Sequence, residues 1–229
     1  MISNPVLLVV HNCLDLTKRC VDSLAGQTIP IDLLVIDNGS VDGTSEWLRE
    51  QRIYTIRNKT NEGVTAAWNL GLGIFFHFGA SHVLVPNNDT VLAPWTYEAL
   101  LSYGSPFVSG VPIRKINFRD KPPMRIFPGS FPDFSLFLIT QHMWDRVGEF
   151  DERMLNYASD CDYHVRAHRL DIPMSKVLVP FYHEPSSTLK KAPERERREI
   201  EIQADRDREV FRSIYGVTPW QSEYFELFK

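Results

Sequence analysis

Short apolar runs alternate with amphipathic segments through the first hundred residues of the chain. Each run has the length of a buried strand, and the segments between the runs show apolar residues at helical spacing. This alternation is typical of βαβ units and of a mostly parallel sheet. The expected strands in this part of the chain cover residues 6–10, 33–36, 53–56 and 83–85.

The helices expected between these strands are defined by their apolar faces and their end residues. In the first helix, Asp15 is expected to cap the start and Gly26 to end it. Its apolar face consists of Leu16, Cys20, Val21 and Leu24. A second helix, containing Trp47 and Leu48, is expected to begin at Asp42 or Thr44, and a third covers residues 64–76.

The second half of the chain is less regular, and its loops are rich in Pro and Gly. Strands are expected at residues 106–111, 133–139 and 177–179. A helix is expected over residues 159–170, because Ser159 is a favourable N-cap and Asp162 and Arg166 have the i,i+4 spacing of an ion pair.

The last part of the chain, residues 191–229, differs from the rest in its density of charge. Its charged residues surround a narrow apolar stripe formed by Ile200, Ala204, Phe211 and Ile214. This pattern predicts an amphipathic helical tail after a single α/β domain that covers residues 1–190. The stripe could lie along the domain or pair with a second copy of the chain as a homodimer.

Composition excludes several classes of protein. The chain has 229 residues with a net charge of −4, which argues against a general nucleic-acid binder held by phosphate contacts. We expect no membrane span, because no apolar run approaches the ~20 residues that cross a bilayer. Three cysteines without CxxC spacing suggest neither a disulfide framework nor a zinc cluster, so a cytoplasmic location is the default expectation.

Polar residues collect at the carboxyl ends of the expected strands, where open α/β sheets bind their ligands. The carboxylates there and at the start of the 159–170 helix are Asp37, Asp42, Asp89, Asp133, Asp160 and Asp162. For any one of them, the alternative is a loop residue that bonds its own backbone.

Several ordered motifs connect these positions. They are Val-Val-His-Asn at 9–12, Ile-Asp-Asn-Gly-Ser-Val-Asp-Gly-Thr at 36–44, Asn-Glu-Gly at 61–63, Asn-Asn-Asp at 87–89, Gly-Glu-Phe-Asp-Glu at 148–152 and Ser-Asp-Cys-Asp at 159–162. In this order, over about residues 5–190, the chain resembles glycosyltransferase family 2, the inverting sugar-nucleotide enzymes of the GT-A fold, and is similar to its rhamnosyltransferase-like branch. The resemblance implies a GT-A-like fold with a mostly parallel central sheet flanked by helices.

The same resemblance assigns residues 1–115 to donor binding and residues 116–190 to acceptor binding. Asp37 would accept from the base N–H of a uracil or thymine, so the donor would be a UDP- or dTDP-type nucleoside-diphosphate sugar. The loop at 61–63 and the helix start after it would lie near the nucleotide, where a helix N-terminus favours phosphate. The donor-binding residues implied are His11, Asn12, Asp37, Asn38, Asn61, Gly63 and Asn88.

A divalent metal, Mn²⁺ or Mg²⁺, is implied by the position of residues 87–89. This segment occupies the place of the family's DXD motif but keeps only one carboxylate, Asp89. His183 matches a histidine that can complete such a site. A metal also suits the chemistry, because a diphosphate leaving group gathers negative charge and the chain is itself acidic.

The acceptor side is implied by residues 159–162, where the family's catalytic base aligns with Asp160. Ser159 replaces the Glu that normally precedes this base, and Ser159 and Asp162 are the expected acceptor-binding residues. The acceptor hydroxyl could belong to a glycan, a lipid-linked sugar or a protein. The alternative for Asp160 is a helix-start residue that only stabilises the helix dipole.

Two other functions remain open from the sequence. A sugar-phosphate nucleotidyltransferase would also place a nucleotide at strand ends, but no Gly-rich loop followed by Arg and Lys stands near the first strand. A non-catalytic sugar-nucleotide or glycan binder would explain why Asn87 and Ser159 stand where acidic residues are usual.

Overall fold

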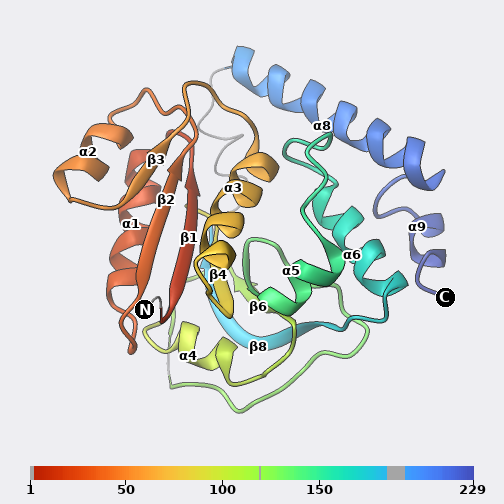
Figure 1. Cartoon of the computed structure of the whole chain (residues 1–229), viewed down its shortest axis with the longest axis horizontal. Coiled ribbons are helices and arrows are strands. Elements are labelled where there is room, and N and C mark those ends of the chain that lie inside the picture. Colours follow the sequence, from red (N-terminus) through yellow and green to blue (C-terminus); the bar gives the residue numbers. More distant parts are fainter. Residues whose placement is uncertain (1–2, 119, 185–193) are drawn as a thin grey trace.

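A single mixed β-sheet with helices on both faces forms the body of the molecule (Figure 1). The computed structural model describes residues 3–118, 120–184 and 194–229. The strands are β1 (Pro5–Val10), β2 (Asp32–Asp37), β3 (Thr55–Arg57), β4 (His82–Pro86), β5 (Thr90–Val91), β6 (Phe107–Ile113), β7 (Leu136–Thr140) and β8 (Met174–His183). The helices are α1 (Leu14–Ala25), α2 (Thr44–Glu50), α3 (Val64–His77), α4 (Thr96–Leu101), α5 (Gln141–Val147), α6 (Ser159–Arg169), α8 (Glu194–Tyr215) and α9 (Ser222–Glu226).

The strand order is β3-β2-β1-β4-β7-β6-β8-β5. The first four strands of this order run parallel, as the βαβ pattern of the sequence predicted. Strand β7 then pairs antiparallel with both β4 and β6, and the short β5 pairs antiparallel with the end of β8. The parallel half of the sheet therefore collects its carboxyl ends at one edge, where the following loops meet.

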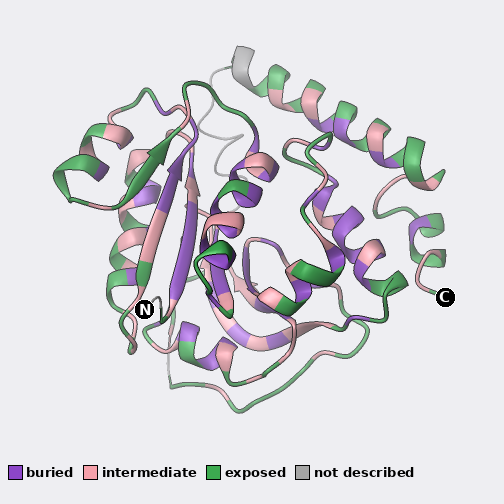
Figure 2. Cartoon of the chain, in the orientation of Figure 1, coloured by how far each residue is buried: buried purple, intermediate pink, exposed green. Residues whose placement is uncertain are grey.

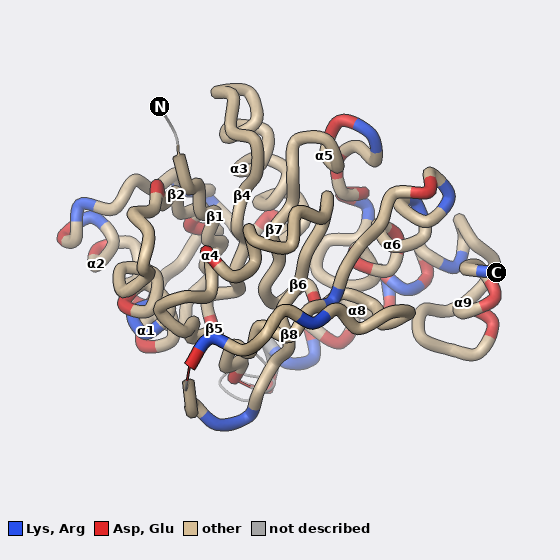
Figure 3. The backbone as a smooth tube through the Cα atoms, turned by 90° about the horizontal axis from the view of Figure 1, so that it is seen from below, with Lys and Arg blue, Asp and Glu red and all other residues tan. Residues whose placement is uncertain are grey.

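Alternating side chains of the strands form two apolar layers. On one face, residues such as Val6 and Leu8 pack with α1, α2 and α4. On the other face, Leu7 and Ile36 pack with α3, α5 and α6. Figure 2 shows the buried strands between these helices. Figure 3 shows that the central strands β1, β4 and β7 contain no charged residues and that the charged residues lie on peripheral helices and loops.

The C-terminal segment forms a third layer. Helices α8 and α9 lie against α6, and Phe211 and Tyr224 are fully buried with Cys161 and Val165 of that helix (Figure 1). The charged C-terminal helix therefore lies along the domain. This is the first of the two predicted arrangements, the other being pairing with a second copy of the chain. The expected boundary between residues 190 and 191 lies outside the described residues.

The apolar stripe of α8 is narrower than expected from its spacing. Ala204 and Phe211 are buried inside the chain, whereas Ile200 is half-buried and Ile214 is 39% exposed. Pairing of two copies through α8 would therefore have to use exposed positions such as Ile202 and Ile214. Among the described residues, no helix combines the length and apolar character that crossing a bilayer requires.

Several element boundaries differ from the sequence predictions. Helix α1 begins after Cys13, so Asp15 lies inside its first turn instead of capping it. The carboxylate of Asp42 accepts from the backbone N–H groups of Leu14 and Thr44 and so joins the starts of α1 and α2. Likewise, the residue before α6 is Ala158, and Ser159 is already helical.

Four short elements, β5, α4, α5 and α9, were not predicted. Each has seven residues or fewer, which is too short for a periodic pattern to stand out. The expected strands at 53–56 and 133–139 begin two and three residues later, at Thr55 and Leu136.

Candidate functional site

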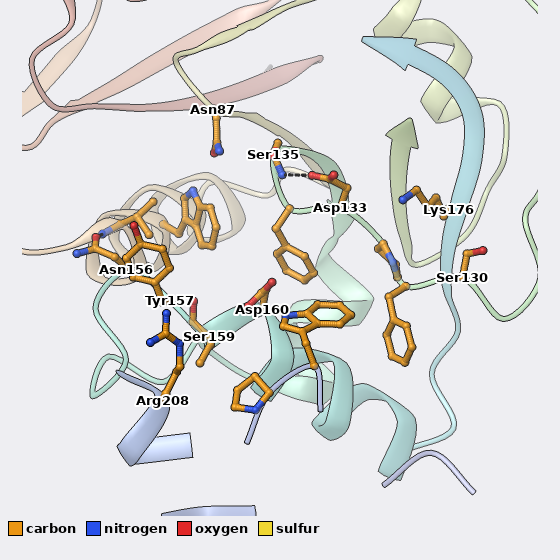
Figure 4. Close-up of a pocket in the computed structure, with 18 residues that line it drawn as sticks. Asn87, Ser130, Asp133, Ser135, Asn156, Tyr157, Ser159, Asp160, Lys176 and Arg208 are labelled. Atoms are coloured by element: carbon orange, nitrogen blue, oxygen red, sulfur yellow. Dashed lines mark hydrogen bonds between the residues drawn. The ribbon is translucent and has the colours of Figure 1, made fainter. Parts of the chain in front are cut away.

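A pocket of about 730 Å³ opens beyond the carboxyl end of β4. Its walls come from the loop that precedes β7, the turn that precedes α6, strand β8 and the C-terminal segment (Figure 4). Its polar and charged lining residues include Asn87, Asp133, Asn156, Asp160, Lys176 and Arg208. The pocket thus combines residues from the edge predicted to bind ligands with residues more than a hundred positions further along the chain.

Asp160 lies in this pocket at the start of α6. Burial raises the pKa of its carboxyl, hydrogen bonds from Cys161 lower it, and the negative charge of Asp133 raises it again, so that the pKa lies above its usual value. One oxygen accepts the backbone N–H of Cys161 at 2.8 Å. Asp160 therefore does contact the helix start, as the alternative interpretation held, but it is also a stronger base than an ordinary aspartate and faces a cavity.

The turn before Asp160 is held on one side by the start of α3. The backbone N–H of Val64 donates to Oδ1 of Asn156 at 3.0 Å, and that of Thr65 donates to the carbonyl of Leu155 at 3.1 Å. Gly63 allows this approach, because a Cβ at that position would lie 2.8 Å from the Leu155 oxygen. The first N–H groups of α3 are thus used within the protein, and the expected phosphate site at this helix start is not what the geometry favours.

Asp207 of α8 holds the same turn from the other side. Its fully buried carboxylate accepts the backbone N–H groups of Leu155, Asn156 and Tyr157 at 3.1, 2.9 and 2.8 Å. Three converging N–H groups form a concave anion site, filled here by a carboxylate of the chain itself. The position of Asp160 therefore depends on both an N-terminal helix and the C-terminal helix.

Asp133 also lines the pocket, although the sequence analysis gave it no role. Its Oδ1 accepts the backbone N–H of Ser135 at 2.8 Å (Figure 4). Its charge raises the pKa of both Asp160 and His183, so Asp133 lies within electrostatic reach of the expected base and of the expected metal ligand.

The two expected metal ligands are neighbours. Strand pairing places Thr90 opposite His183, and Oδ2 of Asp89 lies 3.3 Å from Nε2 of His183. Burial lowers the pKa of His183, but the hydrogen bond to Asp89 and the charges of Asp89 and Asp133 outweigh it, so the pKa is raised.

Asp89 and His183 could supply two of the ligands of a metal ion but do not complete its coordination. Within the described parts of the chain, no group of three or more His, Cys, Asp or Glu side chains forms a complete metal site. A carboxylate oxygen next to an imidazole nitrogen suits Mn²⁺, which takes both, better than Mg²⁺, which prefers oxygen. Diphosphate oxygens of a donor would have to supply further ligands.

Asp37, the expected base-reading residue, is fully buried. Its carboxylate accepts the backbone N–H of Ser40 at 2.9 Å and the hydroxyl of Ser45, and it lies 3.6 Å from Nε of Arg57. A carboxylate can accept further donors, but Ser40, Ser45 and Arg57 already surround this one.

Asn38 and Asn61 are also hydrogen-bonded to other groups within the protein. The Asn38 amide donates to Oδ1 of Asn61 and to the carbonyl of Gly63, each at 2.9 Å. Oδ1 of Asn38 accepts from Asn58 and from the backbone of Glu62. Asn38 is buried with all its hydrogen-bonding groups engaged, so the geometry supports a structural role for Asn38, Asn61 and Gly63.

The remaining expected donor residues are half-buried and lie around the ends of β1 and β4. Nδ1 of His11 lies 2.9 Å from the carbonyl of Asn38, and Oδ1 of Asn12 accepts the backbone N–H of Val41. Asn88 donates to the Thr17 hydroxyl at 3.2 Å. His11 and Asn12 thus connect the first-strand motif to the second-strand motif, Asn88 contacts α1, and all three side chains retain accessible surface.

A second pocket of about 370 Å³ lies beside α2 and β3. It is lined by Asp37, Ser45, Glu46, Arg49, Ile53, Thr55 and Arg57. This pocket gives Asp37 a cavity on its outer side, with two arginines at the wall.

The two expected acceptor residues have different surroundings. Ser159 lines the large pocket. Asp162 does not: its Oδ2 accepts from Arg166 at 2.7 Å, which confirms the expected ion pair, and its Oδ1 accepts from the Tyr215 hydroxyl at 2.7 Å. Because both oxygens are engaged toward Arg166 and the tail, the geometry favours a structural role for Asp162.

The C-terminal segment supplies pocket residues that the sequence analysis did not consider. Arg208, Pro219 and Trp220 line the same pocket as Asp160. One signal was present in the sequence: Asp207 stands on the apolar stripe between Ala204 and Phe211, where a charged residue at a core position indicates a buried contact.

Comparison with protein families supports the resemblance seen in the motifs. Residues 6–106 match the model of glycosyl transferase family 2. The match covers the parallel half of the sheet, and the resemblance to this family is thereby confirmed over that region. Comparison with curated proteins finds no match.

Solved structures share the fold over nearly the whole chain. TarS from S. aureus aligns with a TM-score of 0.61 and 14% identity over 99% of this chain and 47% of its own, so this chain spans about half the length of that protein. Glucosyl-3-phosphoglycerate synthase from Mycobacterium tuberculosis, solved with Mn²⁺, UDP and glucosyl-3-phosphoglycerate, aligns with a TM-score of 0.64 and 12% identity over 96% of this chain and 82% of its own.

A mannosyltransferase from Pyrobaculum calidifontis, solved with GDP-Man and Mn²⁺, aligns with a TM-score of 0.58 and 17% identity over 87% of this chain and 59% of its own. At these identities the structures establish the fold. The chain has the GT-A fold, as the motifs predicted.

Proposed function

We propose that the chain is an inverting glycosyltransferase that moves a sugar from a nucleoside-diphosphate sugar to an acceptor hydroxyl. The observation that carries the proposal is Asp160: a carboxyl with a raised pKa lines the large pocket within electrostatic reach of Asp133, and Asp133 in turn acts on the Asp89–His183 pair. The match of residues 6–106 to glycosyl transferase family 2 supports the same reaction class.

In the proposed reaction, Asp160 takes the proton of the acceptor hydroxyl. The acceptor oxygen forms a bond to the anomeric carbon, the bond from that carbon to the diphosphate oxygen breaks, and the nucleoside diphosphate leaves with the electron pair. One displacement inverts the anomeric centre, so one positioned base suffices and no covalent nucleophile is needed.

Asp89 and His183 would hold a divalent cation, Mn²⁺ or Mg²⁺, with Mn²⁺ the better fit to this pair. When bound, that cation stabilises the charge that develops on the diphosphate. Three structural neighbours were solved with Mn²⁺ and a nucleotide or nucleotide sugar, which supports this assignment. His11, Asn12 and Asn88 lie near the same edge and would contact the donor.

For the nucleotide we propose a UDP- or dTDP-type base near Asp37, with Arg57 moving to admit it. UDP complexes among the structural neighbours support a uracil, whereas GDP-Man in another leaves the base open. Arg57 would then give up its contacts with Asp37 and with the carbonyl of Ser40, because Asp37 itself has no exposed surface.

The test is an assay of nucleoside diphosphate released from UDP- and dTDP-sugars, with Mn²⁺ present or chelated. Metal-dependent release is expected, and Asp89→Ala should abolish it. Release of pyrophosphate from a nucleoside triphosphate would instead indicate a nucleotidyltransferase. Donor binding without turnover under any of these conditions would indicate a sugar-nucleotide binder and would contradict the proposal.

A further inference from the structure

The C-terminal segment, residues 194–229, forms one wall of the pocket that contains Asp160. It contributes Arg208, Pro219 and Trp220 to the lining. The segment is fixed to the domain by Phe211 and Tyr224, which are fully buried, and by the three N–H groups that Asp207 accepts. The wall is therefore a fixed part of the folded chain.

Trp220 is the largest side chain that this wall presents to the pocket. It is 50% exposed, whereas Tyr224 of the same aromatic cluster is fully buried. Its ring lies 5.5 Å from that of Phe131 in an edge-on arrangement and 5.3 Å from that of Tyr224. Its backbone has φ of 63°, which is uncommon for a bulky residue and requires support from the surroundings. The indole is thus held in place by its neighbours while half of it stays open.

The pocket around Trp220 combines aromatic and hydrogen-bonding surface. Phe131 and Trp220 supply apolar faces, whereas Asn156, Asp133 and Ser130 supply donors and acceptors. A pyranose ring has the matching chemistry, because one face carries C–H groups that pack on an indole and the rim carries hydroxyls.

We infer that Trp220 is the platform on which a sugar ring of the acceptor stacks, with one of its hydroxyls toward Asp160. The acceptor is then a glycan or glycoside and not an acyclic alcohol. The inference rests on the proposed function and deepens it by naming the acceptor class. In the proposed transfer step, Trp220 touches the substrate but takes no part in proton transfer.

The position of Trp220 assigns it to the acceptor and not to the donor. The residues expected to hold the nucleotide, including Asp37, His11 and Asp89, belong to the first half of the chain, and none of them lines this pocket. Asn87, two residues before the expected metal ligand Asp89, also lines this pocket. The acceptor ring would therefore enter from the C-terminal side and meet the donor sugar near Asn87.

Phe225 offers a matched control. It belongs to the same aromatic cluster, with its ring 5.7 Å from that of Phe131, and is 41% exposed, but it does not line the pocket. Trp220→Ala and Phe225→Ala each remove an exposed ring from this cluster, and only the first removes the proposed platform. Trp220→Phe keeps an aromatic face.

The experiment measures nucleoside diphosphate release from UDP-N-acetylglucosamine, UDP-glucose and dTDP-rhamnose. Each donor is tested alone and with methyl pyranosides of glucose, N-acetylglucosamine and rhamnose, or with the acyclic polyol sorbitol. In the wild type, a pyranoside and not sorbitol should stimulate release above donor hydrolysis. Trp220→Ala should raise the KM for that pyranoside about tenfold, with Trp220→Phe intermediate and Phe225→Ala unchanged.

Donor hydrolysis without acceptor should be the same in all four proteins, and thermal unfolding should be shifted alike by the two alanine variants. Stimulation by sorbitol as strong as by the pyranosides, no stimulation by any pyranoside, or an unchanged KM in Trp220→Ala would overturn the platform while leaving the transferase proposal intact. Absence of donor hydrolysis and donor binding in the wild type would instead remove the proposed function itself. Saturation-transfer NMR with the pyranosides gives a second readout, in which Trp220→Ala should lose the signal that Phe225→Ala retains.

Discussion

Two groups of polar residues in this molecule look alike in sequence and differ in the structure. Around Asp37, Asn38 and Asn61, at the end of β2, hydrogen-bonding groups are buried and paired within the chain. In the large pocket, Asp133 and Asp160 face a cavity and the pKa of Asp160 is raised. The first group stabilises the loops through hydrogen bonds, and the second group faces a cavity where a substrate could react.

The difference shows that a recognisable motif and a reactive site need not coincide. The nine-residue motif at 36–44 is the feature of the sequence most similar to the family, yet its carboxylates bond to Ser40, Ser45 and Thr44 within the same loop. Asp160 stands in a motif with an altered preceding residue, yet its buried surroundings raise its pKa and make its carboxylate a stronger base for proton abstraction. Substitutions in the two groups should therefore have opposite consequences for stability.

The largest expected effect on stability belongs to Asp207, which connects the tail to the Asp160 turn. Asp207→Ala leaves three backbone N–H groups without their acceptor, and the free energy of unfolding should fall by about 3 kcal/mol or more. Urea unfolding measures this change. Glu201→Ala, which alters an exposed residue of the same helix, is the control and should be near neutral. Equal stabilities of the two variants would show that the tail does not hold the turn.

Asp37→Asn should destabilise the chain by about 1 to 3 kcal/mol. The amide cannot accept from both Ser40 and Ser45 and no longer neutralises Arg57. Differential scanning calorimetry gives the change in unfolding midpoint. A variant as stable as the wild type would mean that Asp37 is free to serve the nucleotide alone, and the contrast between the two groups would disappear.

The pH dependence of the free energy of unfolding tests the burial of His164. Burial lowers the pKa of His164 to about 3, against ~6.5 in an unfolded chain, although a hydrogen bond to Pro132 opposes the shift. The unfolded state therefore binds a proton below pH 6.5 that the folded state excludes, and stability falls as the pH decreases. This group should account for about 2 kcal/mol between pH 7 and pH 5. His164→Phe, which keeps an aromatic ring beside Phe131, should flatten the slope, and an unchanged slope would contradict the assignment.

Asp160→Asn should have the smallest effect on stability, and its sign should be opposite to that of Asp37→Asn. The folded-state pKa of Asp160 is raised, so its ionised form is less favourable in the folded protein than in the unfolded chain at neutral pH. Removing that charge should raise the unfolding midpoint by about 1 to 3 °C. A clear loss of stability would place Asp160 among the structural carboxylates.

The sequence predicted the parallel half of the sheet well, because strand-length apolar runs and helical spacing are local signals. It also predicted that Asp89 and His183 would meet and that Asp162 would pair with Arg166. It did not predict which carboxylates already accept hydrogen bonds within the chain, because their partners are distant in sequence. Asp162 accepts from Tyr215, and Asp207 accepts from the turn before Asp160, in each case across about fifty positions.

The main feature that the sequence did not predict is the contribution of the C-terminal tail to the lining of the large pocket. The apolar stripe of the tail predicted a helix that lies along the domain or pairs with a second copy, and only the position of Asp207 on that stripe indicated a buried polar contact. Trp220 follows α8 in a loop whose backbone conformation is set by the surrounding aromatic cluster. No local pattern places such a residue next to Asp160.

The most direct test of Asp160 as the base compares donor binding with sugar transfer in Asp160→Asn. Transfer to the acceptor should fall by about 10²- to 10⁴-fold, because an amide cannot take the proton that Asp160 is proposed to accept. The calorimetric affinity for the nucleoside-diphosphate sugar should be unchanged. Asp171→Asn, an exposed aspartate just after α6, should keep full activity. Full transfer by Asp160→Asn, or loss of donor binding in step with transfer, would contradict the role of Asp160.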